Sequence, residues 1–175
     1  MRNKGIVQLY TGNGKGKTTA AIGQAVRAAG AGMKVAFFQF LKEGVFPQSE
    51  EKMMKKCGIK VVRFREKSPL FDKAVDMKKL RASVRADWEK VKTAIRSGKY
   101  GMIVLDEVTH LVSLKLLDKK ELCAAVNMTG AGCHFILTGR DAAKSIVRTA
   151  DLVTEMKQIK HPYSRGVKAQ RGIEF

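Results

Sequence analysis

The segment that decides the fold is GNGKGKTT at Gly12–Thr19, which follows the short apolar run Ile6–Tyr10. This order predicts a strand, a glycine-rich turn and a helix that begins at Lys17. Glycine permits the positive φ angles and the close backbone approach that such a turn needs. The N–H groups of the turn and of the first helical turn then converge on one point, where phosphate oxygens fit. The segment therefore predicts a phosphate-binding loop.

The side chains of this loop indicate a nucleotide with a metal ion. Lys17 would place a point charge on a polyphosphate, and the hydroxyl of Thr18 is placed to bind Mg²⁺. The usual pattern begins with a glycine where this chain has Thr11, but three glycines remain in the loop. The alternative is a turn that only caps a helix, and such a turn needs neither two lysines nor Lys-Thr-Thr at the start of the helix.

The rest of the chain alternates apolar runs rich in β-formers with helical stretches, which predicts a parallel sheet covered by helices. We expect a doubly wound α/β fold of the P-loop NTPase (RecA-like) type, as one domain over residues 1–175. Asp118 and Asp141 are expected to cap two of the helices. The further strands are expected at Lys34–Phe40, Ile59–Phe64, Gly101–Leu105, Cys133–Thr138 and Asp151–Glu155, and the helices at Lys17–Ala29, Phe46–Cys57, Asp72–Ser97, Lys119–Val126 and Ala142–Thr149.

The composition limits the cellular compartments and the binding partners that we expect for this protein. The chain begins without the apolar run of a signal peptide and has no stretch of membrane-spanning length, so we expect a cytoplasmic protein without membrane contact. Its three cysteines lack metal-ligand spacing, which fits thiols in a reducing compartment. The net charge of +18 suits nucleic acid, an anionic small substrate or an acidic protein. No nucleic-acid module accompanies it and aromatic residues make up only 7% of the chain, which counts against nucleic acid as the main ligand.

A second part of the nucleotide site is predicted at Met102–Glu107, an apolar strand that ends in Asp106 and Glu107. A carboxylate there can reach Mg²⁺ directly or through water. Glu107 could instead be the general base of an ATP hydrolase. Arg140 ends the next strand, at the edge of the sheet where open α/β folds bind ligands. The basic segment 157–175, expected to pack on the same domain, is either a solvated edge or a rim for phosphates or carboxylates.

These residues resemble the P-loop-type ATP:cob(I)alamin (corrinoid) adenosyltransferases. The resemblance covers Tyr10–Ala21 with its Thr11 departure, Arg27, Gln39–Lys42, Val104–Glu107, Thr138–Arg140, Ala150–Met156, Lys160-His161 and Ala169–Glu174, in the expected order over nearly the whole chain. It implies that the Co(I) of a corrinoid attacks the ribose C5′ of ATP and releases triphosphate. It also implies that ATP lies reversed in the loop, so that C5′ faces cobalt.

On this resemblance the protein positions its substrates and neutralises charge, and it needs no nucleophile of its own. Lys17 and Glu107 are the expected catalytic residues, with Thr18, Glu107 and Asp106 around Mg²⁺. Phe64, Phe71 and Trp88 are the aromatic side chains available to the corrin, although core packing is the more common fate of a Trp88 on an amphipathic helix. The residues expected to bind ATP are Gly12, Asn13, Gly14, Lys15, Gly16, Lys17, Thr18, Thr19 and Arg27.

The resemblance further implies a homodimer, and the basic surface would suit an acidic flavoprotein as the reductant that generates Co(I). Two other hypotheses remain at this point. One is a small RecA-like ATPase that binds nucleic acid, and the other is a nucleotide-binding switch without catalysis. The transferase releases triphosphate, whereas the ATPase releases ADP and phosphate.

Overall fold

The fold is built on a parallel sheet whose strands all point the same way. The computed structural model describes residues 5–42, 49–69, 72, 74–128 and 132–173, and within them the six-stranded sheet has the order β3-β2-β4-β5-β1-β6. The carboxyl ends of the strands therefore share one edge, where the predicted loop and carboxylates meet. The strands are β1 (Val7–Thr11), β2 (Val35–Gln39), β3 (Lys60–Arg63), β4 (Met102–Asp106), β5 (His134–Thr138) and β6 (Leu152–Glu155).

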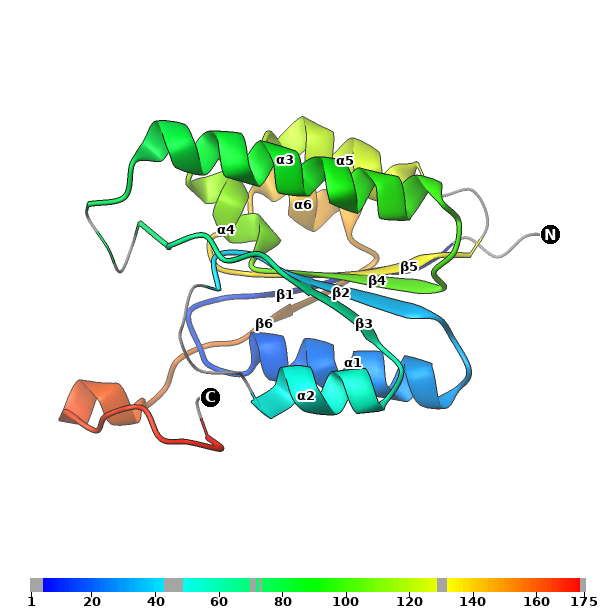
Figure 1. Ribbon diagram of the computed structural model, residues 1–175. Coiled ribbons are helices and arrows are strands. Elements are labelled where there is room, and N and C mark those ends of the chain that lie inside the picture. Colours follow the sequence, from blue (N-terminus) through cyan, green and yellow to red (C-terminus); the bar gives the residue numbers. More distant parts are fainter. Residues whose placement is uncertain (1–4, 43–48, 70–71, 73, 129–131, 174–175) are drawn as a thin grey trace.

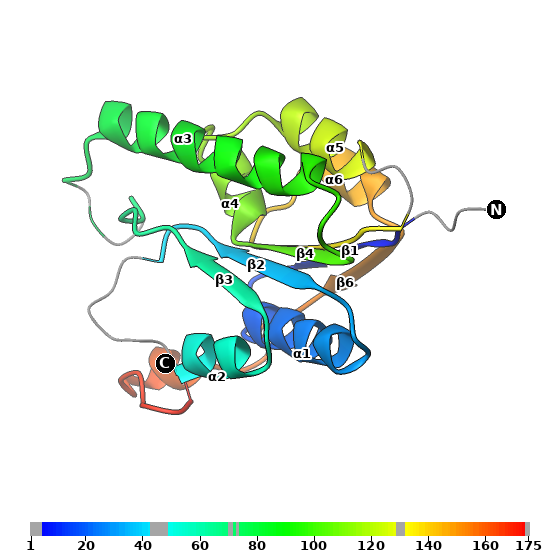
Figure 2. The same cartoon turned by 45° about the vertical axis from the view of Figure 1, so that its right-hand side comes forward.

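Helices cover both faces of the sheet (Figure 1). Two of them, α1 (Lys17–Gly30) and α2 (Ser49–Lys56), lie on one face. The other face carries α3 (Met77–Arg96), α4 (Val108–Ser113), α5 (Lys119–Asn127) and α6 (Lys144–Thr149). After β6 the chain runs on the α1–α2 side and forms a short 3₁₀ helix at Pro162–Arg165, as both views show (Figure 2). The expected doubly wound arrangement is therefore present.

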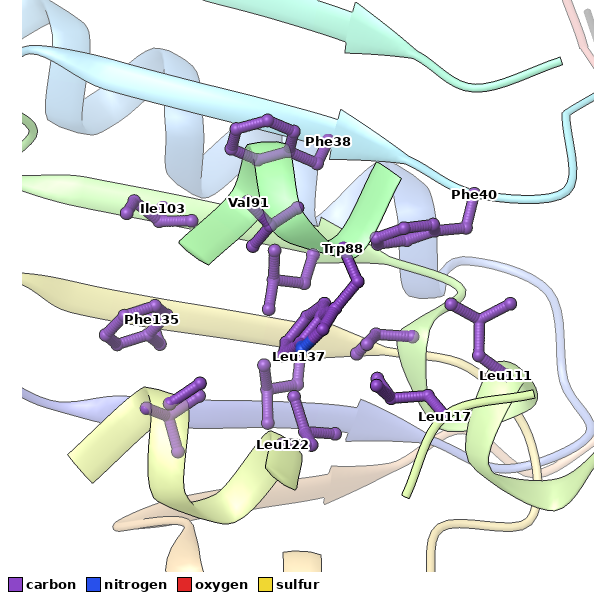
Figure 3. Close-up of a cluster of buried hydrophobic side chains, with 14 of the residues drawn as sticks. Phe38, Phe40, Trp88, Val91, Ile103, Leu111, Leu117, Leu122, Phe135 and Leu137 are labelled. Carbon is purple, nitrogen blue, oxygen red and sulfur yellow. The ribbon is translucent and has the colours of Figure 1, made fainter. Parts of the chain in front are cut away.

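Each face of the sheet has its own hydrophobic core because successive strand residues point to opposite sides. On β2, Phe37 joins the core under α1 and α2, whereas Phe38 joins the core under α3 to α6. Trp88 of α3 is fully buried in the second core, beside Leu137 and Leu122 (Figure 3). Its indole N–H donates to Glu121 Oε1 at 2.9 Å, so the polar atom of this large side chain is paired.

The structure corrects two local predictions. Asp141 does not cap α6: it has a left-handed backbone with φ of 51°, and the N-cap residue is Ala143, whose side chain makes no capping bond. Asp118 does cap α5, since its carboxylate accepts hydrogen bonds from the amides of Lys120 and Glu121. The short helix α4 was not predicted; it begins directly after Glu107, its N-cap residue, whose side chain makes no capping hydrogen bond.

Candidate active site

The phosphate-binding loop joins β1 to α1 as predicted. Gly12 and Gly16 have φ angles of 99° and 116°, which favour glycine, and α1 begins at Lys17. Gly16 is the N-cap, and no side chain in the described part of the protein caps the first amides of the helix. The first turn of α1 also contains no acidic residue. These amides and the positive end of the helix dipole are therefore available to an anion.

The end of β6 fixes the outer side of this loop. The amide of Gly14 donates to the carbonyl oxygen of Met156 at 2.6 Å. A Cβ at Gly14 would come within 2.7 Å of the same oxygen, and one at Gly12 within 2.5 Å. Both glycines are therefore needed for close packing against the end of β6, and Gly12 is needed for its positive φ angle as well. The segment after β6 also contacts the loop directly, because Lys15 Nζ donates to the carbonyl of Ile173 at 2.7 Å.

Lys17 lies across the loop. Its ammonium donates to the carbonyl oxygens of Gly12 at 2.8 Å and Gly14 at 2.7 Å, and the residue is only 7% exposed. Burial lowers the pKa of Lys17, and the nearby Arg140 and Lys42 lower it further, while Glu107 and Asp106 oppose this shift. The side chain is thus part of a dense cluster of charges.

The carboxylates after β4 lie next to the loop. Asp106 is fully buried, and its Oδ1 accepts hydrogen bonds from the hydroxyls of Thr18 at 2.9 Å and Thr138 at 2.7 Å. The amide of Glu107 in turn donates to Thr138 Oγ1 at 2.9 Å. Glu107 has a left-handed backbone with φ of 63°, so the chain turns sharply there before α4 begins. Helix α1 and strands β4 and β5 thereby bring two hydroxyls and two carboxylates to the same edge.

Lys17, Thr18 and Glu107 line a cleft of about 560 Å³, whereas the buried Asp106 is not among the lining residues and reaches the cleft only through its partners. Most residues expected to bind ATP line it, whereas Arg27 is exposed on α1 and, with Gly12, is not among the lining residues. Arg140 lines the cleft, as its strand-end position predicts. Sequence patterns did not single out the functional role of Lys42, although its position directly after a strand could have done so. Other lining residues not predicted to bind ATP are Ile22, Ser49, Glu50, Gln158, His161, Gly172 and Ile173.

The three aromatic residues considered for the corrin have different positions. Trp88 is fully buried in the core, and Phe71 lies outside the described residues. Phe64 is 4% exposed, packs against Phe40 with the two rings tilted and their centroids 4.9 Å apart, and lines a second cleft of about 310 Å³ between the segment after β3 and α3. The other residues that line this second cleft are Arg63, Arg65, Glu66, Ser83, Asp87 and Lys90.

Comparison with known proteins agrees with this geometry. Residues 3–175 match the family model of the ATP:corrinoid adenosyltransferase BtuR/CobO/CobP. The chain belongs to this family. Proteins named corrinoid adenosyltransferase in Escherichia coli and Salmonella typhimurium are 36% identical over 173 residues, which is 98% of this chain and 86% of each relative. One from Pseudomonas aeruginosa is 32% identical over 172 residues, 98% of this chain and 84% of that relative.

A solved structure supports the fold class. A KaiC-like protein from Pyrococcus horikoshii superposes with a TM-score of 0.52 at 19% identity, over 90% of this chain and 74% of that one. The predicted P-loop fold, the adenosyltransferase family and the enzyme class are therefore confirmed. None of the helices in the described part of the chain combines the length and hydrophobicity needed to cross a membrane.

Proposed function

We propose that the cleft binds ATP and transfers its 5′-deoxyadenosyl group to the Co(I) of a corrinoid, releasing triphosphate. The observation that carries this proposal is that the loop, Lys17, Thr18 and Glu107 line one cleft in a member of this family, with Asp106 bonded to Thr18 behind it. The C5′–O bond breaks and its electron pair leaves with the triphosphate, so the protein must neutralise charge on the leaving group. The corrinoid supplies the nucleophile.

The residues at the base of the cleft fit Mg²⁺. Thr18, Asp106 and Glu107 offer only oxygen ligands, which this ion prefers. Among the described residues, Asp106 Oδ2 and both side-chain amide atoms of Gln39 are buried without a hydrogen-bond partner. Gln39 is paired with Asp106 in the β2–β4 register, so these polar atoms are suited to the waters that Mg²⁺ retains. The described residues contain no cluster of three or more His, Cys, Asp or Glu, which fits a site completed by phosphates and water.

Each side chain then has a defined task. Loop amides and Lys17 hold phosphate oxygens, and Thr18 with Glu107 and Asp106 would hold Mg²⁺, which supplies charge neutralisation when bound. Water activation at a phosphate is not required, so Glu107 acts as a ligand rather than as a general base. We also propose the reversed ATP orientation that the family resemblance implies, because it presents C5′ to cobalt.

The surroundings of the site complete the proposal. Segment 157–175 forms a basic rim on the same single domain, which is supported by His161 and Gln158 lining the cleft. A homodimer, a cytoplasmic location and an acidic flavoprotein reductant remain proposals on the family resemblance and the charge of +18. A nucleic-acid-binding ATPase is not favoured, since that charge is its only support.

An anaerobic assay tests the reaction. Chemically reduced cob(I)alamin, ATP and Mg²⁺ are mixed with the protein, and the corrinoid spectrum and phosphate products are followed together. We expect a light-sensitive alkylcorrinoid and an equal amount of triphosphate. Persistence of Co(I) while ADP and phosphate accumulate would overturn the proposal and favour the ATPase.

A further inference from the structure

Lys42 lies just beyond β2, where its ammonium faces the buried carboxylate of the cleft. Its Nζ is 3.6 Å from Asp106 Oδ2, and its side chain is 22% exposed. The other oxygen of Asp106 is occupied by two hydroxyl donors, whereas no donor in the described part of the chain lies within hydrogen-bonding distance of Oδ2. Lys42 is therefore near enough for attraction but does not satisfy this oxygen.

The backbone around Lys42 is held in place from two sides. Leu41 has a left-handed conformation with φ of 52°, which a non-glycine residue adopts at some cost. Arg63, at the end of the neighbouring strand β3, donates from Nε to the carbonyl oxygen of Lys42 at 2.8 Å. The main chain of Lys42 is thus fixed, and its flexible stem can place the ammonium at more than one point in the cleft.

Lys42 also belongs to a group of cations that face one another. With Lys17 and Arg140 it lines the cleft, so three cationic side chains share one site. Like charges at one place repel unless anions are bound between them. Asp106 and Glu107 compensate only part of this charge, so a polyanion is the ligand that the group fits.

We propose that Lys42 contacts the triphosphate and stabilises it as the leaving group, a role that rests on the proposed function. Lys42 and a divalent ion compete for Asp106 Oδ2, so metal binding frees the ammonium for the phosphates. When the C5′–O bond breaks, its electron pair passes to the triphosphate oxygen and adds one negative charge there. A cation at this oxygen stabilises the transition state more than bound ATP.

The test compares Lys42→Met with Lys42→Arg and with Lys60→Met as the matched control. Lys60 is exposed at the start of β3, so it lies at the amino ends of the strands, whereas the cleft lies at their carboxyl ends. Its replacement by methionine removes the same positive charge. Binding of inorganic triphosphate with Mg²⁺ is measured by titration calorimetry. We expect Lys42→Met to weaken binding about tenfold or more, which matches the loss of one charge-assisted contact. Lys42→Arg should recover most of the affinity, and the control should bind like wild type.

Two further measurements separate this role from a structural one. In the transfer assay, kcat of Lys42→Met should fall about tenfold while KM for ATP rises less, because the contact strengthens as charge builds. Without nucleotide, Mn²⁺ followed by electron paramagnetic resonance should bind Lys42→Met more tightly than wild type, because a competitor for Asp106 is gone. A structural defect would instead weaken the binding of both triphosphate and Mn²⁺.

Wild-type triphosphate affinity in Lys42→Met would overturn the inference, as would Mn²⁺ binding that is unchanged or weaker. These results are independent of the reaction itself. If the wild-type protein binds triphosphate but forms no alkylcorrinoid, the proposed function fails while the binding measurement still decides the contact with Lys42. If the wild type is active and Lys42→Met is equally active, only the inference fails.

Discussion

Two buried carboxylates stand beside the two clefts, and they are held in opposite ways. Asp106 meets two hydroxyl donors and an ammonium. Glu66, in the second cleft, accepts one hydrogen bond from Ser83 at 2.9 Å and also lies against Asp87, which Lys90 contacts at 2.6 Å. Burial, followed by the hydrogen bond with Asp87, raises the pKa of Glu66 to about 7. Asp106, held by hydroxyl donors, is therefore suited to a bound cation. Glu66, in the second cleft, favours its protonated form.

The comparison shows that burial alone does not define a functional carboxylate. Asp106 is next to the predicted loop, and its partners come from β1–α1, β2 and β5, so several segments were needed to build its surroundings. The side-chain hydrogen bonds of Glu66 join it to Ser83 and Asp87 of α3, and its pairing with another acid links it to pH-dependent stability. The predictions below test this division.

The largest effect is expected for Lys17→Ala. This change removes the charge that lies across the loop and faces the phosphates, so the transfer rate should fall about a thousandfold or more. The rate is measured in the anaerobic assay at saturating ATP, with Lys60→Ala as a control for the loss of one positive charge. Near-normal turnover would show that the cleft beside Asp106 does not depend on Lys17 for catalysis.

A smaller loss is expected for Glu107→Gln. The amide keeps the shape of the side chain but is a poorer metal ligand, so activity should fall about 10- to 100-fold, in the range found for altered metal surroundings. Raising the Mg²⁺ concentration should recover part of the rate. Activity equal to wild type at every Mg²⁺ concentration would show that Glu107 is not a ligand of the metal.

Glu66→Gln tests the other carboxylate through stability. Between its ordinary pKa of 4.5 and the folded value of about 7, the folded state binds the proton and the unfolded state does not. Wild-type stability should therefore fall as pH rises through this window, by about 1–3 kcal/mol. Glu66→Gln should flatten this slope and be more stable than wild type at pH 8, as measured by urea unfolding.

The partner residue provides a second variant for the same slope. Asp87→Asn removes the neighbouring acid, so the pKa of Glu66 should move back toward its ordinary value and the slope between pH 5 and 7 should weaken. A slope that persists in both variants would mean that another group causes it.

The smallest effect is expected for Asp118→Ala. This surface carboxylate caps α5 through the amides of Lys120 and Glu121, and its loss should cost about 1 kcal/mol in the free energy of unfolding. Asp141→Asn is the matched control, because Asp141 makes no cap and asparagine tolerates its left-handed backbone. A loss of similar size in the control would contradict the assignment of the caps.

Local patterns predicted much of the fold. All six strands and α1 appear where apolar runs and the glycine-rich loop placed them. Strands β2 and β4 are buried along their whole length, and a strand buried on both faces is apolar throughout, whereas β6 is exposed. The helix α4 and the cap of α6 were missed because they depend on left-handed residues, Glu107 and Asp141, that carry a Cβ. No sequence pattern identifies such positions in advance.

The active site was predicted only in part, because some of its contacts join segments that are separated in the chain. The loop, Thr18 and Asp106 follow from two short motifs, and the structure brings them within hydrogen-bonding distance. Lys42 and the pairing of Glu66 with Asp87 depend on contacts between segments far apart in the chain. Such contacts follow from strand order, which the sequence alone did not specify.

The bond between Gly14 and the carbonyl of Met156 has a consequence for how the protein is made. The loop is synthesised long before β6, and among the described strands β6 pairs only with β1. Contacts between such distant segments form late because a long stretch of chain must first be closed. A growing chain can therefore fold its earlier strands and helices during synthesis, yet its nucleotide site is completed only after β6 has been made.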